Sequence, residues 1–453
     1  MTKSSNSSST AAIILAAGLG TRMKSELPKV LHPLAGQPMV QALLDSVAAI
    51  TASRAVVIIS DGAETVANAV APHPTVVQTE QLGTGHAALQ ARDQLADFEG
   101  DILILFGADP LITAETLQAM LARRRADDAP AIVVLGFRPD DAALYGRLLT
   151  DTDGMLEGIV EARDATDEQL QIELCNSGVM CVDGARLFDL LDRVDNDNAK
   201  GEYYLTAIIA LARADGLSCA VIEGEAEELT GVDDRADLAQ AEAIMQKRLR
   251  LRAMAGGATL IDPDTIYFSF DTELGHDVTV GPNVVFGPGV RVADNVTIRP
   301  FCHIEGATIS AGAVIGPFAR LRPGAQLAED VRVGNFVEIK NAQLERGAKV
   351  SHLTYIGDAR VGEAANIGAG TITCNYDGFG KHFTDIGAHA FIGSNTALVA
   401  PVKVGDGAII GAGSTISKDI AADALAVTRA PQRQADGWAA KFRKSKKTEK
   451  DKT

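Results

Sequence analysis

The sequence lacks an excess of positive charge, and it also lacks long hydrophobic runs. It contains 42 lysines and arginines against 59 aspartates and glutamates, so its formal net charge is −17. Binding to nucleic acid requires a basic surface that neutralises phosphates, so this balance argues against a nucleic-acid partner. No apolar stretch approaches the ~20 residues that a membrane-spanning helix needs. We therefore expect neither nucleic acid nor a membrane span in the function of this chain.

Cysteine is scarce as well. The five cysteines are scattered along the chain without a CxxC pair: Cys175, Cys181, Cys219, Cys302 and Cys374. An odd number without paired spacing argues against a disulfide scaffold and against a zinc site. The cysteine pattern therefore favours a reducing, cytoplasmic compartment.

Both ends of the chain are polar, and we expect them to be disordered. Residues 1–10 form a serine-rich tail. The apolar run that follows, Ala11–Ala17, is short and separated from the start by polar residues, which disfavours a secretory signal peptide. At the other end, Lys441–Thr453 is a lysine-rich, solvated stretch within a C-terminal tail, residues 431–453.

Aromatic residues make up only 5% of the chain, whereas glycine is abundant, with 43 residues. The glycines are unevenly spread, since 18 lie in residues 1–232 and 24 in the shorter stretch 256–430. The length of 453 residues suits two or three domains, and 46% apolar residues exclude wholesale disorder. We infer two halves of different architecture.

The first half, residues 11–232, alternates short apolar runs with amphipathic stretches. This pattern predicts an α/β domain with a Rossmann-like, mainly parallel sheet covered on both faces. Strands are expected at Ala12–Ala17, Ala55–Ser60, Thr75–Gln78, Asp101–Phe106 and Ala131–Phe137, and helices at Met39–Ile50, Thr84–Ala96 and Thr113–Ala126. Such a sheet binds ligands at the carboxyl ends of its strands.

The first expected strand leads directly into a glycine-containing loop that ends at Lys29. Gly18 and Gly20 allow the backbone to approach a ligand closely, and successive N–H groups can surround phosphate oxygens. Arg22 and Lys29 add positive charge suited to a triphosphate. The loop is neither the GxxxxGK[ST] phosphate loop nor GxGxxG, so the specific signal is the whole string LAAGxGTRM…LPK.

The second half has a period of six residues from Gly275 onward. Apolar residues lie six apart in three series: Val280, Phe286, Val292, Ile298 and Ile304; then Ile315, Leu321, Leu327, Val333 and Ile339; then Ile386, Ile392, Leu398, Val404, Ile410 and Ile416. This period predicts a parallel β-helix with three hexads in each coil. We expect aliphatic side chains inside a prism too narrow for rings, small residues at the corners, and a projecting loop at Asn375–Thr384. A connecting helix, residues 233–255, is expected to join the halves, because its acids come first and its bases last.

The first half resembles the sugar-1-phosphate nucleotidyltransferases. Beyond the glycine-containing loop, the matching motifs are Gln78…Gln81-Leu-Gly-Thr-Gly-His86, Leu105-Phe-Gly-Ala-Asp-Pro-Leu111, Tyr145-Gly-Arg147, Ile159-Val-Glu161, Asn176-Ser-Gly178 and Gly201-Glu-Tyr-Tyr-Leu-Thr206. Together they look like the uridylyltransferase (pyrophosphorylase) half of the bifunctional bacterial family that makes UDP-N-acetylglucosamine. The resemblance implies UTP and N-acetylglucosamine 1-phosphate as substrates and Mg²⁺ as cofactor.

The resemblance also implies roles for single residues. Leu15, Ala16, Ala17, Gly18 and Lys29 would hold the nucleotide, Gln78, Gly83 and Thr84 would read the uracil, and Gly146, Glu161 and Asn176 would contact the sugar. Arg22 and Lys29 would act in catalysis by neutralising charge. An anionic sugar phosphate attacks the α-phosphorus of UTP and pyrophosphate leaves, so positioning and charge neutralisation must do most of the work.

The metal site departs from the family pattern in two places. The family usually has Gly-Asp-x-Pro, whereas this chain has Gly107-Ala-Asp-Pro110, so the acid is Asp109 and Ala108 takes its usual place. A shift of one residue along a strand turns a side chain to the other face, so Asp109 reaches the metal only if the loop bends. Asp233 stands where the family typically has asparagine, and it also contributes to nucleotide binding by the resemblance. We expect Asp109 and Asp233 to bind Mg²⁺.

The second half resembles the hexapeptide acyltransferases, and its polar interruptions match the acetyltransferase half of the same bifunctional family. The resemblance implies a left-handed β-helix that forms homotrimers, with active sites between neighbouring prisms. Arg322, Lys340, Tyr355 and Asn366 would hold glucosamine 1-phosphate, and Ala369, Asn375, Tyr376, Ser394, Ala412 and Arg429 would bind acetyl-CoA, with Asn375 and Tyr376 contacting the substrates. These polar groups disfavour a purely structural rod.

By the same resemblance, His352 would be the general base of acetyl transfer. The amine of the substrate is mostly protonated near neutral pH and must lose protons before it attacks a thioester, and histidine has a suitable intrinsic pKa. Glu338 is expected to orient its ring. The other histidines in the repeats, His303 and His389, are interpreted as ordinary surface or core residues.

The sequence therefore predicts a bifunctional enzyme that acetylates glucosamine 1-phosphate and then uridylylates the product to UDP-N-acetylglucosamine, which feeds peptidoglycan and lipopolysaccharide synthesis. The expected domains are 11–232 for uridylyl transfer, 233–255 for the linker helix and 256–430 for acetyl transfer. Two alternatives remain open. One is a nucleotidyltransferase with a structural β-helix, which His352, Lys340 and Tyr355 disfavour. The other is a non-catalytic scaffold like the translation-factor subunits of the same architecture, which Lys29 and Arg22 disfavour and Ala108 favours.

Overall fold

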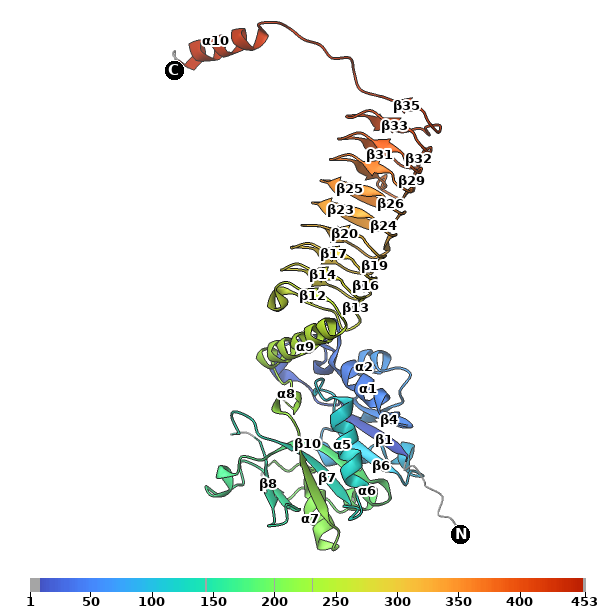
Figure 1. The fold of residues 1–453 in the computed structure, drawn as a ribbon. Helices are drawn as coiled ribbons and strands as arrows, with labels where there is room; N and C mark the ends of the chain where they lie inside the picture. The colour runs from blue at the N-terminus through green and yellow to red at the C-terminus, as the bar shows by residue number, and fades with distance from the viewer. Residues whose placement is uncertain (1–8, 143–144, 199, 230, 451–453) are drawn as a thin grey trace, which may run out of the picture. The chain divides into compact units, whose positions relative to one another are not determined.

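The computed structural model describes residues 9–142, 145–198, 200–229 and 231–450. The chain divides into two compact units, Met1–Leu249 and Arg250–Thr453 (Figure 1). No helix in the described part of the chain is long and apolar enough to cross a membrane. Of the N-terminal tail expected at residues 1–10, residues 1–8 lie outside the described residues, and Thr10 already belongs to the first strand.

The first unit is built on a sheet with the strand order β11-β7-β10-β6-β1-β4-β5. These strands are β1 (Thr10–Leu15), β4 (Arg54–Ser60), β5 (Thr75–Gln78), β6 (Asp101–Phe106), β7 (Ile132–Phe137), β10 (Cys175–Asp183) and β11 (Cys219–Glu223). Neighbours pair in parallel except at β10, which is antiparallel to β6 and β7. Two short antiparallel pairs complete the strands, β2 (Pro33–Leu34) with β3 (Gln37–Pro38) and β8 (Arg147–Thr150) with β9 (Leu156–Val160). The predicted mainly parallel sheet is confirmed, whereas the antiparallel β10 was not predicted.

Helices cover both faces of this sheet, because successive side chains of its buried strands point to opposite faces. Along β1, Ile13 belongs to a core cluster that includes side chains of α3, α6 and α7, and Ile14 belongs to a cluster that includes side chains of α1, α2 and α5. The helices are α1 (Met39–Ala49), α2 (Glu64–Ala69), α3 (Thr84–Leu89), α4 (Arg92–Leu95), α5 (Ala114–Arg124), α6 (Gly184–Leu191), α7 (Ala207–Ala214) and α8 (Ala226–Leu229). The single helix predicted at Thr84–Ala96 was wrong, since α3 and α4 are separate.

A long helix, α9 (Arg235–Ala255), follows the sheet and crosses the boundary between the two units. Its start is two residues later than the predicted one because Asp234 caps it: the Asp234 carboxylate accepts from the backbone N–H of Ala236, at 2.8 Å, and of Asp237, at 3.1 Å. Short 3-10 turns at Thr21–Met23 and Lys29–Leu31 shape the loop after β1.

The second unit is a parallel β-helix of stacked coils (Figure 1). One face contains β12 (Thr259–Leu260), β14 (Thr279–Val280), β17 (Thr297–Ile298), β20 (Val314–Ile315), β23 (Arg332–Asn335), β25 (Lys349–His352), β27 (Asn366–Ile367), β30 (Phe391–Ile392), β33 (Ile409–Ile410) and β35 (Leu425–Ala426). A second series contains β13 (Glu273–Leu274), β16 (Arg291–Val292), β19 (Ala307–Ile309), β22 (Ala325–Leu327), β24 (Glu338–Leu344), β26 (Tyr355–Val361), β28 (Ile372–Cys374), β31 (Ala397–Val399) and β34 (Thr415–Ile416). The remaining strands are β15 (Val285–Phe286), β18 (His303–Ile304), β21 (Arg320–Leu321), β29 (Thr384–Ile386) and β32 (Val402–Val404).

The interior of the β-helix confirms the six-residue period. Every apolar residue of the three predicted series is buried, with at most 5% of its surface exposed. The expectation that rings have no room inside was wrong at one end, where Phe268 and Phe286 stack with ring centroids 5.1 Å apart. Between β28 and β29 the chain forms the predicted projecting loop, in which Phe379 is 99% exposed.

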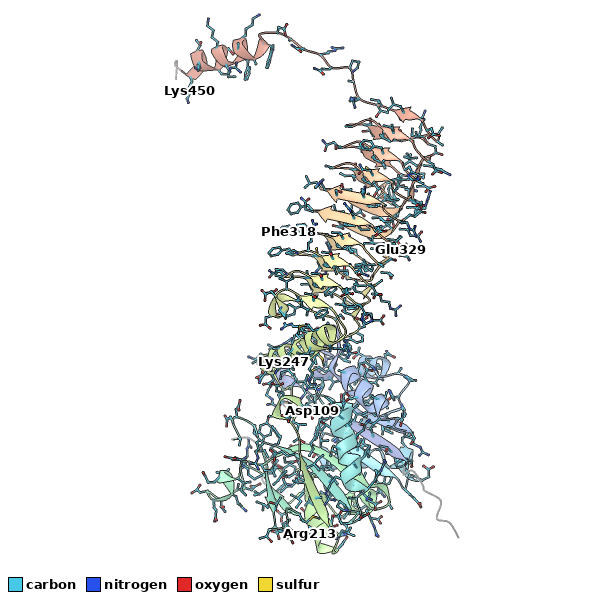
Figure 2. All side chains as sticks on the ribbon, in the orientation of Figure 1. Asp109, Arg213, Lys247, Phe318, Glu329 and Lys450 are labelled. Carbon is cyan, nitrogen blue, oxygen red and sulfur yellow. The ribbon has the colours of Figure 1, made fainter. Side chains whose placement is uncertain are left out.

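One corner of the β-helix does not follow the expectation of small residues. Phe301, Phe318, Phe336 and Leu353 occupy it in successive coils, each with a positive φ between 50° and 62°. The three rings stack at 4.8 and 5.2 Å, and Phe318 points outward from the coils (Figure 2). We call these four residues the apolar corner. Ring stacking and backbone hydrogen bonds between coils stabilise their left-handed backbone conformation, which bulky residues rarely adopt.

The C-terminal end also departs from the expected disorder. Residues Trp438–Lys450 form a helix, α10, in which Trp438 and Phe442 stack with centroids 5.2 Å apart. The lysine-rich composition correctly predicted exposure, but lysine is also a good helix former, and the aromatic pair four residues apart adds support.

Candidate active sites

The first site is a cavity of ≈ 440 Å³ at the carboxyl ends of β1, β5 and β6. Sequence-predicted residues that line it are Leu15, Ala16, Ala17, Gly18, Lys29, Gln78, Gly83, Thr84, Asp109 and Asp233. They come from segments spread over more than two hundred residues, so the fold brings together most of the predicted nucleotide site. Three further predicted residues group together beside it: the Asn176 N–H donates to the Gly146 carbonyl at 2.8 Å, and a Cβ on Gly146 would lie 3.6 Å from the Glu161 carboxylate.

The loop after β1 is shaped by close backbone packing. Gly20 has φ +59°, and a Cβ added there would lie 2.7 Å from Cβ of Lys29. A larger residue at Gly20 would therefore displace Lys29, whose side chain is only 17% exposed. The glycine is thus needed to place the lysine at the cavity.

Two cations meet at Asp233: Lys29, which lines the cavity with Asp233, and Arg22, which is not among the lining residues. Lys29 Nζ and Arg22 Nη2 each lie 2.9 Å from an oxygen of Asp233. Burial opposes the charge of Asp233, but the hydrogen bonds and charges of Lys29 and Arg22 outweigh it and lower the pKa of this carboxyl. Arg22 is 67% exposed and therefore free to turn toward a ligand at little cost.

Asp109 lies in the cavity despite its shifted position. Strand β6 ends at Phe106, and the Asp109 N–H donates to the Phe106 carbonyl at 3.0 Å, which makes a turn. Strand alternation no longer applies in a turn, so Asp109 and Ala108 both line the cavity. The bend in the loop after β6, which Asp109 needs in order to reach the metal, is therefore present.

The environment of Asp109 suits a bound cation. Burial raises its pKa to about 7, the Lys29 charge lowers it, and the Asp233 charge raises it further. Two carboxylates beside the predicted nucleotide site match Mg²⁺, which takes oxygen ligands from one or two carboxylates and from substrate phosphates. No group of three or more histidine, cysteine or acidic side chains suited to a metal occurs in the described ranges, so the protein would supply this pair only.

Gln78, which was predicted to read the uracil, is held by two contacts within the protein. Its Nε2 lies 3.2 Å from the Gly83 carbonyl, to which it donates, and 3.0 Å from Nδ1 of His86. Thr84 Oγ1 accepts from the Leu205 N–H at 3.0 Å, so this hydroxyl is also engaged by the protein. His86 fixes the amide of Gln78 and was not predicted as a site residue.

The cavity also includes residues that sequence reasoning missed. Tyr145, Ser177 and Glu202 line it, and all three lie inside motifs that had been recognised. Burial and the charges of Asp109 and Asp233 raise the pKa of Tyr145, so its hydroxyl stays protonated and can donate. Their positions within the recognised motifs were the sequence signal that could have identified them as site residues.

The second site lies on the β-helix around Tyr355. The Tyr355 hydroxyl accepts from Asn375 Nδ2 at 3.4 Å, and the same amide nitrogen donates to the buried carboxylate of Asp358. A Cβ on Gly357 would lie 2.2 Å from the Tyr355 hydroxyl, so only glycine leaves room for this ring. Tyr355 and Asn375, both predicted, are thus bonded directly, and Asp358, which was not predicted, holds the amide of Asn375.

A cluster of cations surrounds this point. Contact with Lys381, the charge of Lys381, some burial and the charge of Arg322 together lower the pKa of Lys340. Arg322 also forms an ion pair of 2.8 Å with Glu338. Two adjacent ammonium groups repel each other unless an anion lies between them, so the cluster suits a phosphate. Lys381 was missed because it lies in the projecting loop, where a lysine is ordinarily only solvated.

His352 is oriented by a different residue from the one expected. Its Nδ1 lies 2.7 Å from Oδ1 of Asn335, the residue paired with it between β23 and β25. Glu338 lies opposite Tyr355 on another face and pairs with Arg322. The prediction that Glu338 orients His352 was therefore wrong, and Asn335 takes that place.

The remaining predicted residues follow one edge of the later coils. Ala369, Ser394 and Ala412 stack in successive coils, linked by backbone bonds of 2.8 Å from Asn395 to Ala369 and from Gly413 to Ser394. Arg429 donates to the Ala412 carbonyl. The Gly370 N–H donates to the His352 carbonyl at 3.3 Å, which brings His352 beside the first of these coils. Asn366 pairs with Phe391, and Tyr376, which is 63% exposed, donates to the Gly378 carbonyl at 2.7 Å.

Comparisons with known proteins cover both halves. Residues 12–174 match a MobA-like NTP transferase domain, and residues 271–306 and 383–418 match the bacterial transferase hexapeptide repeat. The chain is 60% identical over 448 residues to a protein of Paramagnetospirillum magneticum named "Bifunctional protein GlmU", covering 98% of this chain and 100% of that one. Proteins of the same name from Rhodospirillum rubrum and Sphingopyxis alaskensis are 65% identical over 434 residues and 54% identical over 447. The first covers 96% of this chain and 97% of its own length, and the second covers 98% and 99%.

Proposed function

The chain belongs to the family of bifunctional GlmU proteins, and from that premise we infer that it is an enzyme with two consecutive activities. The left-handed β-helix transfers acetyl from acetyl-CoA to glucosamine 1-phosphate. The Rossmann-like domain then transfers uridylyl from UTP to N-acetylglucosamine 1-phosphate and releases pyrophosphate. We assign these activities to residues 256–430 and 11–232, joined by the helix at 233–255. The product, UDP-N-acetylglucosamine, would feed peptidoglycan and lipopolysaccharide synthesis in the cytoplasm, a location that the five unpaired cysteines favour.

Uridylyl transfer is supported best by Lys29, Asp109 and Asp233, which line one cavity, with Arg22 paired to Asp233. Asp109 and Asp233 would hold Mg²⁺, which when bound would supply positive charge next to the phosphates. Lys29 is released from Asp233 toward the α-phosphate and stabilises the negative charge that develops there. Gln78 fixes the base and Arg22 closes over the phosphates, so the sugar phosphate meets the α-phosphorus in line with the departing pyrophosphate.

Acetyl transfer is supported best by the hydrogen bond between His352 and Asn335. This bond orients the ring, and if Nδ1 carries the proton that Asn335 Oδ1 accepts, Nε2 remains free to take a proton from the amine of glucosamine 1-phosphate. Arg322, Lys340 and Lys381 hold the phosphate while Tyr355 and Asn375 position the sugar. The neutral amine then attacks the thioester carbonyl, the C–S bond breaks, and coenzyme A leaves as its thiol.

Two assays on the purified full chain test this function. Coenzyme A thiol should appear with acetyl-CoA and glucosamine 1-phosphate, and pyrophosphate should appear with UTP, Mg²⁺ and N-acetylglucosamine 1-phosphate. Removing Mg²⁺ with a chelator should stop only the second reaction. Unmeasurable pyrophosphate release would contradict the uridylyltransferase assignment, and absent thiol release would contradict the acetyltransferase assignment.

We also propose that the chain forms homotrimers through the apolar corner. Phe301, Phe318, Phe336 and Leu353 are between 45% and 61% exposed, in one continuous row beside His352. Such a row of large apolar side chains is typical of an interface. A neighbouring prism would complete the acetyl-transfer site, in agreement with the family resemblance.

Replacing Phe318 with glutamate is expected to dissociate the trimer, because a charge would be buried at the centre of the row. Analytical ultracentrifugation should show one third of the wild-type mass, and acetyl transfer should fall with it. Leu425→Glu is the matched control, since Leu425 is an exposed apolar residue, 71% exposed, outside the row. A trimeric Phe318→Glu protein would contradict this interface.

A further inference from the structure

The two carboxylates assigned to Mg²⁺ lie on segments that secondary structure does not hold in place. Asp109 follows β6 by three residues, and Asp233 lies between α8 and α9. A backbone hydrogen bond from the Val232 N–H to the Ala108 carbonyl, at 3.0 Å, joins the described parts of the two segments directly. Because a metal site requires fixed distances between its ligands, further contacts must set the spacing of the two carboxylates.

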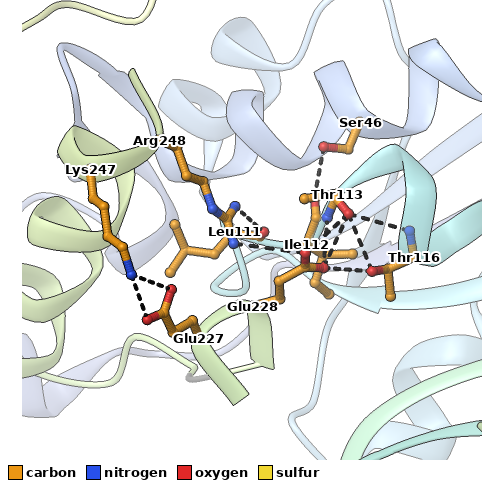
Figure 3. A network of polar contacts seen from close by, with 9 residues as sticks. All are labelled: Ser46, Leu111, Ile112, Thr113, Thr116, Glu227, Glu228, Lys247 and Arg248. Carbon is orange, nitrogen blue, oxygen red and sulfur yellow. Dashed lines mark hydrogen bonds and ion pairs between the residues drawn. The ribbon is translucent and has the colours of Figure 1, made fainter. Parts of the chain in front are cut away.

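Glu228 makes such contacts. It lies on α8, five residues before Asp233 in the sequence, and its carboxylate reaches Thr113 and Thr116 at the start of α5 (Figure 3). Oε2 accepts from the Thr113 N–H at 3.3 Å, from Thr113 Oγ1 at 3.1 Å and from Thr116 Oγ1 at 2.6 Å. The side chain is only 13% exposed, so these bonds are largely shielded from water. A carboxylate at the first turn of α5 is also stabilised by the helix dipole.

Two neighbouring contacts hold the same loop from other sides. Arg248 on α9 donates from Nη1 to the Leu111 carbonyl at 2.6 Å, and its Nη2 lies 3.9 Å from Glu228 Oε1. Ser46 on α1 donates to the Ile112 carbonyl at 2.8 Å (Figure 3). The segment from Leu111 to Thr113, which follows Asp109, is therefore bonded to α1, α8 and α9. Among these contacts, Glu228 connects this segment to α8, the helix that precedes Asp233.

We propose that Glu228 is a positioning residue for magnesium, which sets the distance between Asp109 and Asp233. This inference rests on the proposed uridylyltransferase function. Glu228 acts through its bonds to Thr113 and Thr116, so it supports the metal ligands and does not act on the substrate.

The adjacent residue Glu227 provides a control within the same helix. It pairs with Lys247 at 3.1 Å, but the two side chains are 58% and 61% exposed. An ion pair so exposed to solvent contributes little to stability, and within the described residues neither side chain of the pair contacts the loop after Asp109.

The test titrates Mg²⁺ into the full chain in the presence of saturating UTP, and subtracts the heat of Mg²⁺ binding to UTP alone. Glu228→Ala is expected to raise the apparent Mg²⁺ dissociation constant about tenfold, the effect typical of losing an outer partner of a metal ligand. Saturating Mg²⁺ should restore kcat for uridylyl transfer to nearly the wild-type value, and acetyl transfer should be unchanged. Glu228→Gln, which keeps one acceptor oxygen, should have a smaller effect, and Glu227→Ala should have none.

An unchanged apparent Mg²⁺ dissociation constant in Glu228→Ala would overturn the proposal, even if the thermal unfolding temperature of the variant fell. An equal rise in Glu227→Ala would also overturn it, because the effect would then be general to α8. Should Glu228→Ala fail to fold, as its thermal unfolding curve would reveal, Glu228→Gln decides by the same criterion. A wild-type chain without Mg²⁺-dependent uridylyl transfer would refute the proposed function alone, because the calorimetric comparison of variants still tests Glu228.

Discussion

Acetyl transfer by His352→Ala is expected to fall by about 10²–10⁴-fold, the usual contribution of a general base. The amine of glucosamine 1-phosphate is mostly protonated near neutral pH, and without His352 it must lose its proton to water. The ring is exposed on its outer side and held by Asn335 at 2.7 Å, so its removal leaves no buried cavity. The β-helix should therefore fold normally, and uridylyl transfer by the same variant should remain close to wild type.

The control for this variant is His303→Ala. His303 is an exposed residue on a repeat strand, β18, and lies outside the proposed acetyl-transfer site. Rates are measured by thiol release at saturating acetyl-CoA and compared across pH. Most of the wild-type rate in His352→Ala, or an equal loss in His303→Ala, would contradict the assignment of His352 as the base.

Periodicity predicted the β-helix well because its interior is defined by one residue in six. Ile298, Ile315 and Ile410 are each buried as the pattern required. The six-residue pattern could not predict the apolar corner, because a phenylalanine in a left-handed backbone conformation is stabilised by the rings of neighbouring coils. Strand β10 was not predicted, and its antiparallel direction depends on pairing with β6 and β7, which the apolar pattern of a buried strand does not reveal.

The candidate sites show the same contrast: the order of motifs can be read from the sequence, whereas contacts between distant residues cannot. Motif order located Lys29, Gln78 and Asp233, and the fold brings these three positions together at one cavity by the carboxyl ends of the strands. The partner of His352 depends on which strands stack, and the β-helix places Asn335 beside it while Glu338 faces Tyr355. The place of Asp109 likewise depended on the turn after Phe106, which local alternation could not supply.

The net charge of −17 and the anionic substrates are reconciled by local clusters of cations. Lys29 and Arg22 gather at the first cavity, and Arg322, Lys340 and Lys381 gather at the second site. At physiological ionic strength charges are screened beyond about 8 Å, so a ligand inside either site responds mainly to these cations and little to the distant acidic surface.

Lys29→Ala is expected to lower uridylyl transfer by about 10²–10³-fold, the cost of removing one preorganised donor from a developing negative charge. Lys29 is 17% exposed and lies 2.9 Å from Asp233, so its charge acts in a partly desolvated place where attraction to phosphate is stronger than in water. Arg22 remains in the variant, but it is 67% exposed and cannot replace a shielded charge. The loss should appear in kcat more than in the KM for UTP, because the developing charge is greatest in the transition state.

Lys24→Ala is the matched control for this variant, because Lys24 is an exposed cation of the same loop and is expected to leave both activities unchanged. The thermal unfolding curve of Lys29→Ala serves as the check of folding, because acetyl transfer is assigned to residues 256–430 and reports only on the β-helix. Removing Lys29 also leaves Asp233 with Arg22 as its cationic partner, so Mg²⁺ should bind Lys29→Ala at least as tightly as wild type. A rate within tenfold of wild type, or a loss that saturating Mg²⁺ restores, would show that Lys29 does not stabilise the transition state.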